Sequence, residues 1–393
     1  MYLPNQYRFS CSAKINSGTR ALENLPMELD ALNATRPLII AGENSPRRGY
    51  VKKVISALKD SGMTLGVCDD IPDDPDPSLI GELVNLYRHR DHDSIVAVGA
   101  GPVVDVAKIV NIAISHDGGA SLRQLEGGAR IMNPLGPFIL VPTAGATGYE
   151  TSRYAGVRDM MFSSPFLMPD LVVIDPRMVP AVESGQMIDS AMTALTHAVE
   201  AYTSAAKNPI ADVYGYAAIG FVMKHLAPVV SRPADREGRC ALVNAACMAG
   251  CIISDDTRGM AHALGETVSA MFGIARGISM GIMLPYTVAY RAVNGEAFIA
   301  ELLLPVAGFY EYGRTTPSLR ASVAVTMMID LVRELNETAD GVMPRTLEEA
   351  GVPEYMLQDI AETAVSHGLS RFGRDDYLTV ARQAWEGSPA MDR

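Results

Sequence analysis

A glycine-bearing turn in the first half of the chain has the residue types that bind a nucleotide phosphate. Residues 94–108 read SIVAVGAGPVVDVAK, in which a strand-like apolar run ends at Gly99 and a helix begins after Gly101. The backbone N–H groups of such a turn and the positive end of the helix attract an anion, and glycine lets a pyrophosphate approach closely. Glycines in these turns are also often only steric necessities, so this turn alone leaves both interpretations open.

A second loop follows the next apolar run and adds hydroxyl groups. Residues 137–152 read PFILVPTAGATGYETS, and Thr143, Thr147 and Gly148 come after the strand-like part. Their hydroxyl and backbone groups could bond adenine, ribose or phosphate oxygens. Ligands of parallel sheets bind at the carboxyl ends of the strands, so this second loop favours a nucleotide site.

The elements around these loops change in character along the chain. Up to about Pro180, strand-like runs alternate with helical stretches, which predicts an α/β, Rossmann-like domain with a parallel sheet. From Ser184 onward the periodicity is almost purely helical, which predicts an all-α domain. We therefore expect a dinucleotide-binding α/β domain at residues 1–180 and a helical catalytic domain at residues 181–393.

Composition excludes several classes of partner. The net charge is −12 and the basic residues are scattered, so a nucleic-acid binder is not expected. The N-terminus lacks the features of a signal peptide, and no apolar run approaches the roughly 20 residues of a spanning helix, so we expect a cytoplasmic protein without a membrane partner. The five cysteines show no CxxC pair, and three recur at helical spacing, which indicates reduced thiols on a buried helix face: Cys240, Cys247 and Cys251. A small molecule or a peptide is the expected substrate.

The two loops resemble those of the iron-containing alcohol dehydrogenases. Where that family typically reads GGGSxxDxAK and PTTAGTGSE, this chain has Gly99 to Lys108 with Asp105 in register, and Pro142 to Glu150. LVVIDP, LTHAVEAY, GMAHALG and the stretch PRTLEEAGVPEYMLQDIAETA extend the similarity over nearly the whole chain. The resemblance implies a dehydroquinate synthase-like two-domain architecture, a homodimer, and an NAD(P)-dependent oxidoreductase that interconverts an alcohol and a carbonyl.

The expected cofactor site keeps four residues of the family pattern, which are Asp105, Lys108, Thr143 and Thr147. It departs from the pattern at two other positions, Pro102 and Gly42. Pro102 replaces the family's serine, which removes a hydroxyl and an N–H, so binding should be weaker but retained. Gly42 stands where NAD-preferring members carry an aspartate for the ribose 2′-OH. Because Arg47 and Arg48 follow closely, we expect NADP in preference to NAD. The alternative is that both arginines lie on a solvated helix face.

The metal site implied by the resemblance is largely dismantled. In the family, one ion is held by an aspartate, a histidine four residues later and two further histidines. Here His197 and His262 match two of these ligands, whereas Thr193 and Arg276 occupy the other two positions. Two good ligands and a permanent cation predict that tight Fe²⁺ or Zn²⁺ binding is lost. The alternative is a rearranged metal site with two histidines and one carboxylate, formed by His197, His262 and Glu266. Glu266 stands where the family has a further histidine that is not a metal ligand.

Arginine at this place suggests a different source of positive charge. The fork of Arg276 could bind the substrate oxygen or a carboxylate and supply the charge that the metal provides in the family. His197 or His262 would then act as general base, with Glu266 or Tyr149 as alternative proton carriers. For an isolated histidine, a packing role in a helix is the simpler interpretation, but the match to the family register favours function for both.

Three alternatives remain open at this stage. A β-hydroxy acid held by Arg276 would be oxidised to a β-keto acid that loses CO₂, and the chain is in this respect similar to a daptide-type peptide-modifying branch that acts on a C-terminal threonine. A non-catalytic cofactor-binding protein would also tolerate loss of metal ligands. A sugar-phosphate cyclase such as dehydroquinate synthase is disfavoured because its metal and basic phosphate-binding residues are not found as a set.

Overall fold

The computed structural model describes residues 2–116, 122–128, 130–254, 257–369 and 371–390. The chain forms two compact units, one from Ser10–Ala181 and one from Val182–Arg393, and the N-terminal residues up to Phe9 group with the second unit. The assignment of those N-terminal residues to the first domain is therefore corrected. The second unit consists of helices, as its uninterrupted helical periodicity requires.

The first unit is built on a parallel sheet of six strands among the described residues. The order in the sheet is β1-β9-β6-β4-β2-β3. The strands are β1 (Lys14–Ser17), β2 (Pro37–Gly42), β3 (Gly66–Ile71), β4 (Ser94–Gly99), β6 (Phe138–Pro142) and β9 (Leu171–Ile174). A smaller sheet joins β5 (Gly127–Gly128), β8 (Met160–Ser163) and β7 (Tyr154–Val157).

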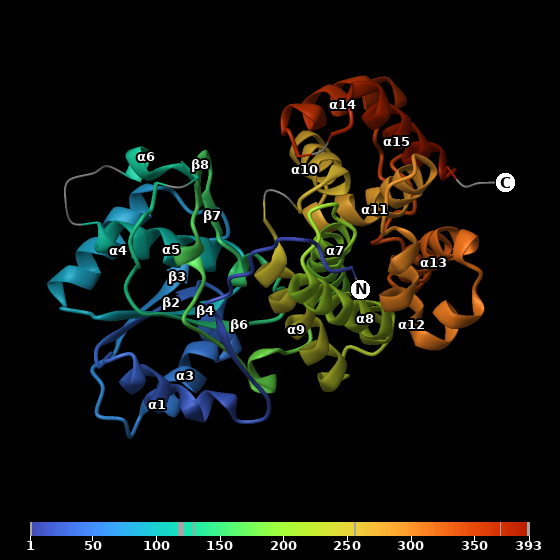
Figure 1. Cartoon of the computed structure of the whole chain (residues 1–393). Helices are drawn as coiled ribbons and strands as arrows, with labels where there is room; N and C mark the ends of the chain where they lie inside the picture. The colour runs from blue at the N-terminus through green and yellow to red at the C-terminus, as the bar shows by residue number, and fades with distance from the viewer. Residues whose placement is uncertain (1, 117–121, 129, 255–256, 370, 391–393) are drawn as a thin grey trace. The chain divides into compact units, whose positions relative to one another are not determined.

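Helices cover both faces of the large sheet (Figure 1). The helices of this unit are α1 (Leu25–Ala31), α2 (Ser45–Arg48), α3 (Tyr50–Leu58), α4 (Ser78–His89), α5 (Pro102–Ser115) and α6 (Leu122–Leu125). Alternate strand residues, such as Ile39 and Ala41 of β2 and Val96 and Val98 of β4, pack with α1 and α3 in one core. The opposite face contacts α5, whose segment from Val103 to Ile112 is almost entirely buried. Sandwiching by helices explains why the central strands are apolar on both faces.

The strand order places a topological switch between β2 and β4. The chain leaves β2 toward the edge strand β3, returns to β4 on the other side of β2, and continues from β4 to β6. In sheets of this kind, ligands bind beyond the carboxyl ends of the strands at such a switch point. Gly42 ends β2, Gly99 ends β4 and α5 begins at Pro102, so the expected cofactor residues lie at this switch point.

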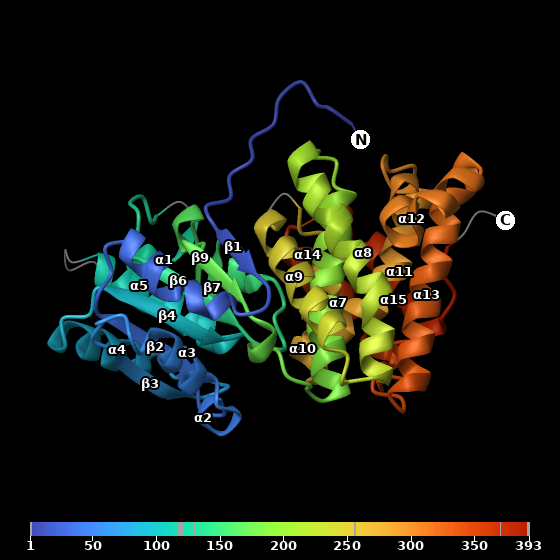
Figure 2. The same ribbon diagram turned by 90° about the horizontal axis from the view of Figure 1, so that it is seen from below.

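The second unit is a set of packed helices. They are α7 (Ser184–Tyr202), α8 (Pro209–Ser231), α9 (Arg236–Ile252), α10 (Met260–Phe272), α11 (Arg276–Val293), α12 (Leu303–Arg314), α13 (Arg320–Thr338), α14 (Leu357–Ser366) and α15 (Arg374–Glu386). Helix α7 contacts α8, α9, α10 and α11, and Figure 2 shows α7 and α8 side by side. Helix α8 is long and apolar enough to span a membrane by length and composition only, which is weak evidence because it packs against α7, α9, α12 and α13. The predicted fold class, a parallel sheet with helices followed by a helical domain, is confirmed.

Candidate active site

The two strand-end glycines of the first unit pack tightly against α5. A Cβ on Gly99 would lie 3.1 Å from Cβ of Val103, and a Cβ on Gly42 would lie 3.1 Å from Cγ2 of the same valine. Gly101 differs, because it has a φ of 56° and no atom within 4 Å of a built Cβ. The steric interpretation therefore applies to Gly42 and Gly99, which meet Val103. The ligand-binding interpretation applies to Gly101, which lies beside open space.

Glu150 joins the two candidate phosphate loops, a role that the sequence analysis did not assign. Its buried carboxylate accepts the N–H of Gly148 at 2.7 Å, that of Thr147 at 3.1 and 3.2 Å, and that of Gly101 at 3.4 Å. These N–H groups belong to both loops, so one side chain fixes their spacing. The available signal was an acidic residue directly after a glycine-rich loop.

Lys108 and Asp105 hold the second loop against α5. The buried ammonium of Lys108 donates to the carbonyls of Tyr149, Ser152 and Tyr154 at 2.7 to 2.9 Å. Burial lowers the pKa of Lys108 to about 8, against the charges of Asp105 and Glu150, which raise it. Since an ammonium has three N–H groups, these bonds account for all of them and give Lys108 a positioning role, while direct binding of a cofactor by Lys108 stays a prediction. Asp105 Oδ1 accepts the N–H of Gly156 at 3.3 Å.

The remaining residues of the expected cofactor site lie at the ends of strands or in the helices that follow strands. Pro102 is the first residue of α5, where its missing N–H costs no helix bond. The N–H of Thr143, directly after β6, donates to the carbonyl of Gly99 at 3.4 Å, which brings that loop beside β4. Arg47 and Arg48 are exposed on α2. Binding of a cofactor by Thr143, Thr147 and these arginines stays a prediction.

The second unit brings the two predicted histidines together. His197 of α7 and His262 of α10 are buried, and their ring centroids lie 5.3 Å apart with the planes tilted by 37°. Burial lowers the pKa of His197 well below its ordinary value, and the charges of His262, Arg276 and Arg258 act in the same direction, whereas Glu266 opposes them. His197 is therefore a neutral imidazole near pH 7, and its surroundings disfavour protonation.

Glu266 links His262 to Arg276. Its Oε1 atom lies 3.4 Å from Nε2 of His262 and 3.7 Å from Nε of Arg276. Burial alone would raise the pKa of Glu266, but the hydrogen bond and charge of His262 and the charges of Arg276 and Arg258 outweigh it and lower the pKa to about 2. Glu266 is thus ionised, and the half-exposed side chain of Arg276 extends from the first residue of α11.

Two acidic side chains of α7 position the helices that carry these groups. Glu200, which the sequence analysis missed, accepts the N–H groups of Gly259 and Ala261 at 2.8 Å and of His262 at 3.2 Å, so it caps the N-terminus of α10. Burial raises the pKa of Glu200, while the charge of His262 and the bond from Gly259 lower it. The side chain thus satisfies N–H groups that a helix leaves unpaired at its start.

Asp189 caps the N-terminus of α11. Its Oδ1 accepts the N–H of Gly277 at 2.6 Å. A Cβ on Gly277 would lie only 1.7 Å from the carbonyl oxygen of Asp189, so this close approach of α7 and α11 requires glycine. The neighbouring residue is Arg276, whose backbone is therefore fixed against the helix of His197.

Tyr149 lies in the other unit, in a 3-10 turn at Tyr149–Thr151. Its carbonyl accepts the Lys108 ammonium at 2.7 Å, so its backbone is held in place. The other four catalytic candidates, His197, His262, Glu266 and Arg276, belong to the helical unit. A catalytic role for Tyr149 stays a prediction.

Comparison with known proteins agrees with this architecture. Residues 12–176 match the model of the iron-containing alcohol dehydrogenases, and residues 187–376 match the C-terminal model of the same family. The chain belongs to the iron-containing alcohol dehydrogenase family. It is an alcohol dehydrogenase-like oxidoreductase.

Named dehydrogenases are similar to this chain over nearly its full length. The chain is 25% identical to choline dehydrogenase of Bacillus subtilis over 96% of this chain and 94% of that protein. It is 26% identical to NADPH-dependent butanol dehydrogenase of Clostridium saccharobutylicum over 91% of each. The structure of an alcohol dehydrogenase from Oenococcus oeni superposes with a TM-score of 0.85, at 23% identity, over 97% of this chain and all of that chain. This last likeness concerns the fold.

The positions that hold the metal in this family carry poor donors here. Thr193 donates its hydroxyl to the carbonyl of Asp189 at 2.9 Å, within its own helix. The guanidinium of Arg276 is a permanent cation and cannot be a ligand. Within the described residues, no three His, Cys, Asp or Glu side chains are grouped to hold an ion, and a metal site from His197, His262 and Glu266 stays a prediction. Two imidazoles, a hydroxyl and a guanidinium do not fit Fe²⁺ or Zn²⁺.

Proposed function

We propose that the protein is an NAD(P)-dependent oxidoreductase that interconverts an alcohol and a carbonyl without a metal, with Arg276 in place of the metal charge. The observation that carries the proposal is the position of Glu266 between His262, at 3.4 Å, and Arg276, at 3.7 Å. A fixed cation and a proton-binding group are the two functions that a metal-free site must supply to such a reaction. The name of the NADPH-dependent butanol dehydrogenase relative supports a nicotinamide cofactor.

The Arg276 guanidinium supplies the electrostatic part of the proposed mechanism. Its backbone is held next to Gly277, whose N–H is fixed by Asp189, so little reorganisation is needed when charge develops on the substrate oxygen. Glu266 balances this cation in the resting site and orients it. A planar fork that donates two hydrogen bonds suits an alkoxide or a carboxylate.

A neutral histidine supplies the proton-transfer part. When bound, a nicotinamide would take the hydride from the carbinol carbon. The hydroxyl proton of the alcohol would pass to His197 or His262, and the carbon–oxygen bond would become a carbonyl. Burial lowers the pKa of His197, which keeps its imidazole uncharged but also makes it a weaker base, so His262, whose Nε2 lies 3.4 Å from Glu266, is the better placed acceptor. Glu266 would then stabilise the positive charge on His262 if the proton is shared between the rings.

Preference for NADP over NAD belongs to the same proposal. Gly42 ends β2 without a carboxylate that could bind the ribose 2′-OH, and Arg47 and Arg48 are exposed a few residues later. A 2′-phosphate would meet no fixed negative charge from Gly42 and could reach a guanidinium.

A β-hydroxy acid is the second candidate substrate, because the side chain of Arg276 is 50% exposed and could bind a carboxylate. Oxidation of the alcohol would give a β-keto acid, whose carbon–carbon bond to the carboxylate breaks with release of CO₂. Release of CO₂ in step with NADPH formation would distinguish this reaction from simple alcohol oxidation. Cofactor binding without turnover of any alcohol would instead indicate a non-catalytic cofactor-binding protein.

The deciding experiment combines elemental analysis of protein purified without chelators, titration of NADH and NADPH by nucleotide fluorescence, and turnover of a panel of alcohols. We expect less than stoichiometric metal, tighter binding of NADPH and turnover that persists in chelator. Stoichiometric Fe or Zn, with activity lost on its removal, would overturn the metal-free mechanism.

A further inference from the structure

A cavity of about 310 Å³ lies at the N-terminal end of α10, the helix that carries His262 and Glu266. The residues that line it include Glu200, Gly259 and Met260, which precede His262 or hold its backbone N–H. Since α10 rises about 1.5 Å per residue, the cavity begins within roughly one helical turn of His262. Its volume is at the lower end of the range of small-molecule sites.

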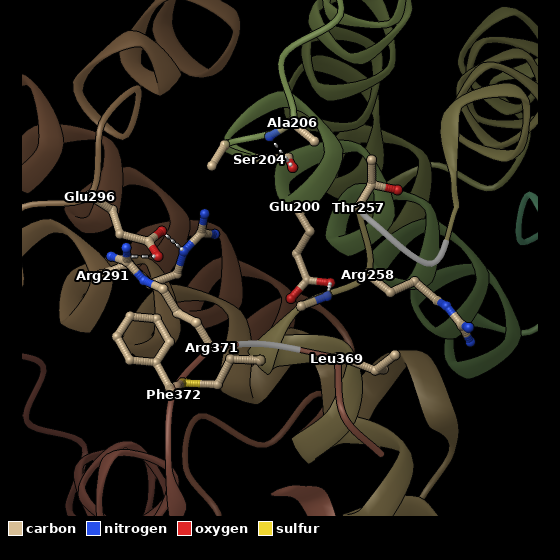
Figure 3. A pocket seen from close by; sticks show the side chains of 13 residues that line it. Glu200, Ser204, Ala206, Thr257, Arg258, Arg291, Glu296, Leu369, Arg371 and Phe372 are labelled. Carbon is tan, nitrogen blue, oxygen red and sulfur yellow. Dashed lines mark hydrogen bonds and ion pairs between the residues drawn. The ribbon is translucent and has the colours of Figure 1, made fainter. Parts of the chain in front are cut away.

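One wall of the cavity is a chain of three charged side chains (Figure 3). Glu296 Oε2 lies 2.6 Å from Nε of Arg291, and its Oε1 lies 3.2 Å from Nη2 of Arg371. Two guanidinium groups share a single carboxylate, so the group carries one excess positive charge. Glu200 also lines the cavity; its oxygens accept backbone N–H groups of α10, and the charge of Arg291 acts on its carboxyl.

The two arginines have different roles in this wall. The side chain of Arg291 is 11% exposed and donates to the hydroxyl and the carbonyl of Thr203 at 3.0 Å as well as to Glu296, so three of its five N–H groups are bonded within the protein. Arg371 has a side chain that is 67% exposed, and within the described part of the chain Glu296 is its one ion-pair partner. Its guanidinium carbon lies 5.3 Å from the ring centre of Phe372, which supports it. Arg371 is therefore the cation that can receive a ligand.

The rest of the lining combines polar residues with an apolar part (Figure 3), and it comes from Ser204, Thr257, Arg258, Ala205, Ala206, Met260, Leu369 and Phe372. A cation with an unshared edge beside apolar side chains fits a carboxylate attached to a short hydrocarbon segment. We propose that this cavity is a carboxylate subsite for the substrate, with Arg371 as the binding cation. The carboxylate of the substrate neutralises the excess positive charge of Arg291, Glu296 and Arg371. The hydroxyl of the substrate lies toward His262. The assignment rests on the proposed function for the reacting end of the substrate.

Binding of hexanoate and of hexanamide, measured by calorimetry without cofactor, tests the subsite independently of turnover. We expect hexanoate to bind and hexanamide to bind about tenfold to a hundredfold more weakly, since hydrogen bonds to a charged group are the stronger ones. Arg371→Gln should abolish that difference. Arg374→Gln is the matched control, because Arg374 also pairs with a single carboxylate, Glu362, at 2.6 Å.

Arg276→Gln separates this subsite from the proposed reacting centre. The subsite predicts that Arg276→Gln retains the preference for hexanoate. If Arg276→Gln loses the preference and Arg371→Gln retains it, the carboxylate binds at Arg276 and the subsite is refuted. Equal binding of acid and amide to the unmodified protein also refutes it. If hexanoate binds through Arg371 but no alcohol is turned over, the subsite is supported and the proposed function fails.

Discussion

Asp189 Oδ1 accepts the N–H of Gly277 at 2.6 Å, and this bond joins the helix of His197 to the helix that begins at Arg276. The bond spans 88 positions of sequence. It places the permanent cation of Arg276 close enough to the buried histidines to act on the pKa of His197. The charge in the site is thereby fixed by the backbone of α11, and the following predictions test what that charge does.

Arg276→Gln should reduce kcat strongly, by about 10²- to 10³-fold, as removal of one preorganised oxyanion donor does in other enzymes. Arg276→Lys keeps the charge but loses the planar fork, so we expect an intermediate kcat. Steady-state kinetics with saturating cofactor measures both. Unchanged cofactor affinity by fluorescence titration is the control, and a kcat for Arg276→Gln equal to that of the unmodified protein would exclude the role.

The double variant Thr193→Asp with Arg276→His should bind a divalent metal. It restores an aspartate and a histidine at the two positions where the family has ligands, next to His197 and His262, and it removes the cation that repels an ion. Elemental analysis after reconstitution with Fe²⁺ or Zn²⁺ measures the gain, with Arg276→Gln as the control that removes only the charge. The idea fails if the double variant binds no more metal than that control.

Cofactor preference should shift when a carboxylate is restored at the end of β2. Gly42→Asp should weaken NADPH binding about tenfold or more relative to NADH, because a carboxylate repels a 2′-phosphate and accepts a bond from a 2′-OH. Gly42→Asn is the matched control, since both side chains must displace Cγ2 of Val103, which lies 3.1 Å from a built Cβ. The ratio of the two dissociation constants is the measurement. An unchanged ratio in Gly42→Asp would argue that Gly42 is remote from the ribose.

The sequence predicted the elements of the site better than the contacts that hold them. Strand ends at Gly42 and Gly99 and the helical positions of His197 and His262 follow from local patterns, which residue periodicity and family register describe. The caps provided by Glu200 and Asp189 join residues 59 and 88 positions apart, and no local pattern marks such a pair. The three acceptors of Lys108 were not predicted for the same reason, because they lie more than 40 residues away in the sequence.

Glu200→Ala should destabilise the helical unit by roughly 1–3 kcal/mol, because three N–H groups at the start of α10 lose their acceptor inside the protein. Urea unfolding followed by circular dichroism measures the free energy of unfolding. Glu334→Ala, at an exposed position of α13, is the matched control and should change it by less than about 0.5 kcal/mol. Equal effects of the two substitutions would contradict the capping role.

Stability should depend on Glu266 at acid pH. The folded state lowers the pKa of Glu266 from 4.5 to about 2, so the ionised group stabilises the fold above its ordinary pKa. That contribution is lost as the pH falls from about 4.5 through about 2, with a slope of at most about 1.4 kcal/mol per pH unit. Glu266→Gln does not titrate, so its deficit in unfolding free energy relative to the unmodified protein should be constant above pH 5 and should shrink toward pH 2. Urea unfolding between pH 2.5 and 6 measures the deficit. A deficit that does not change over this range would mean that neither His262 nor Arg276 stabilises the charge of Glu266.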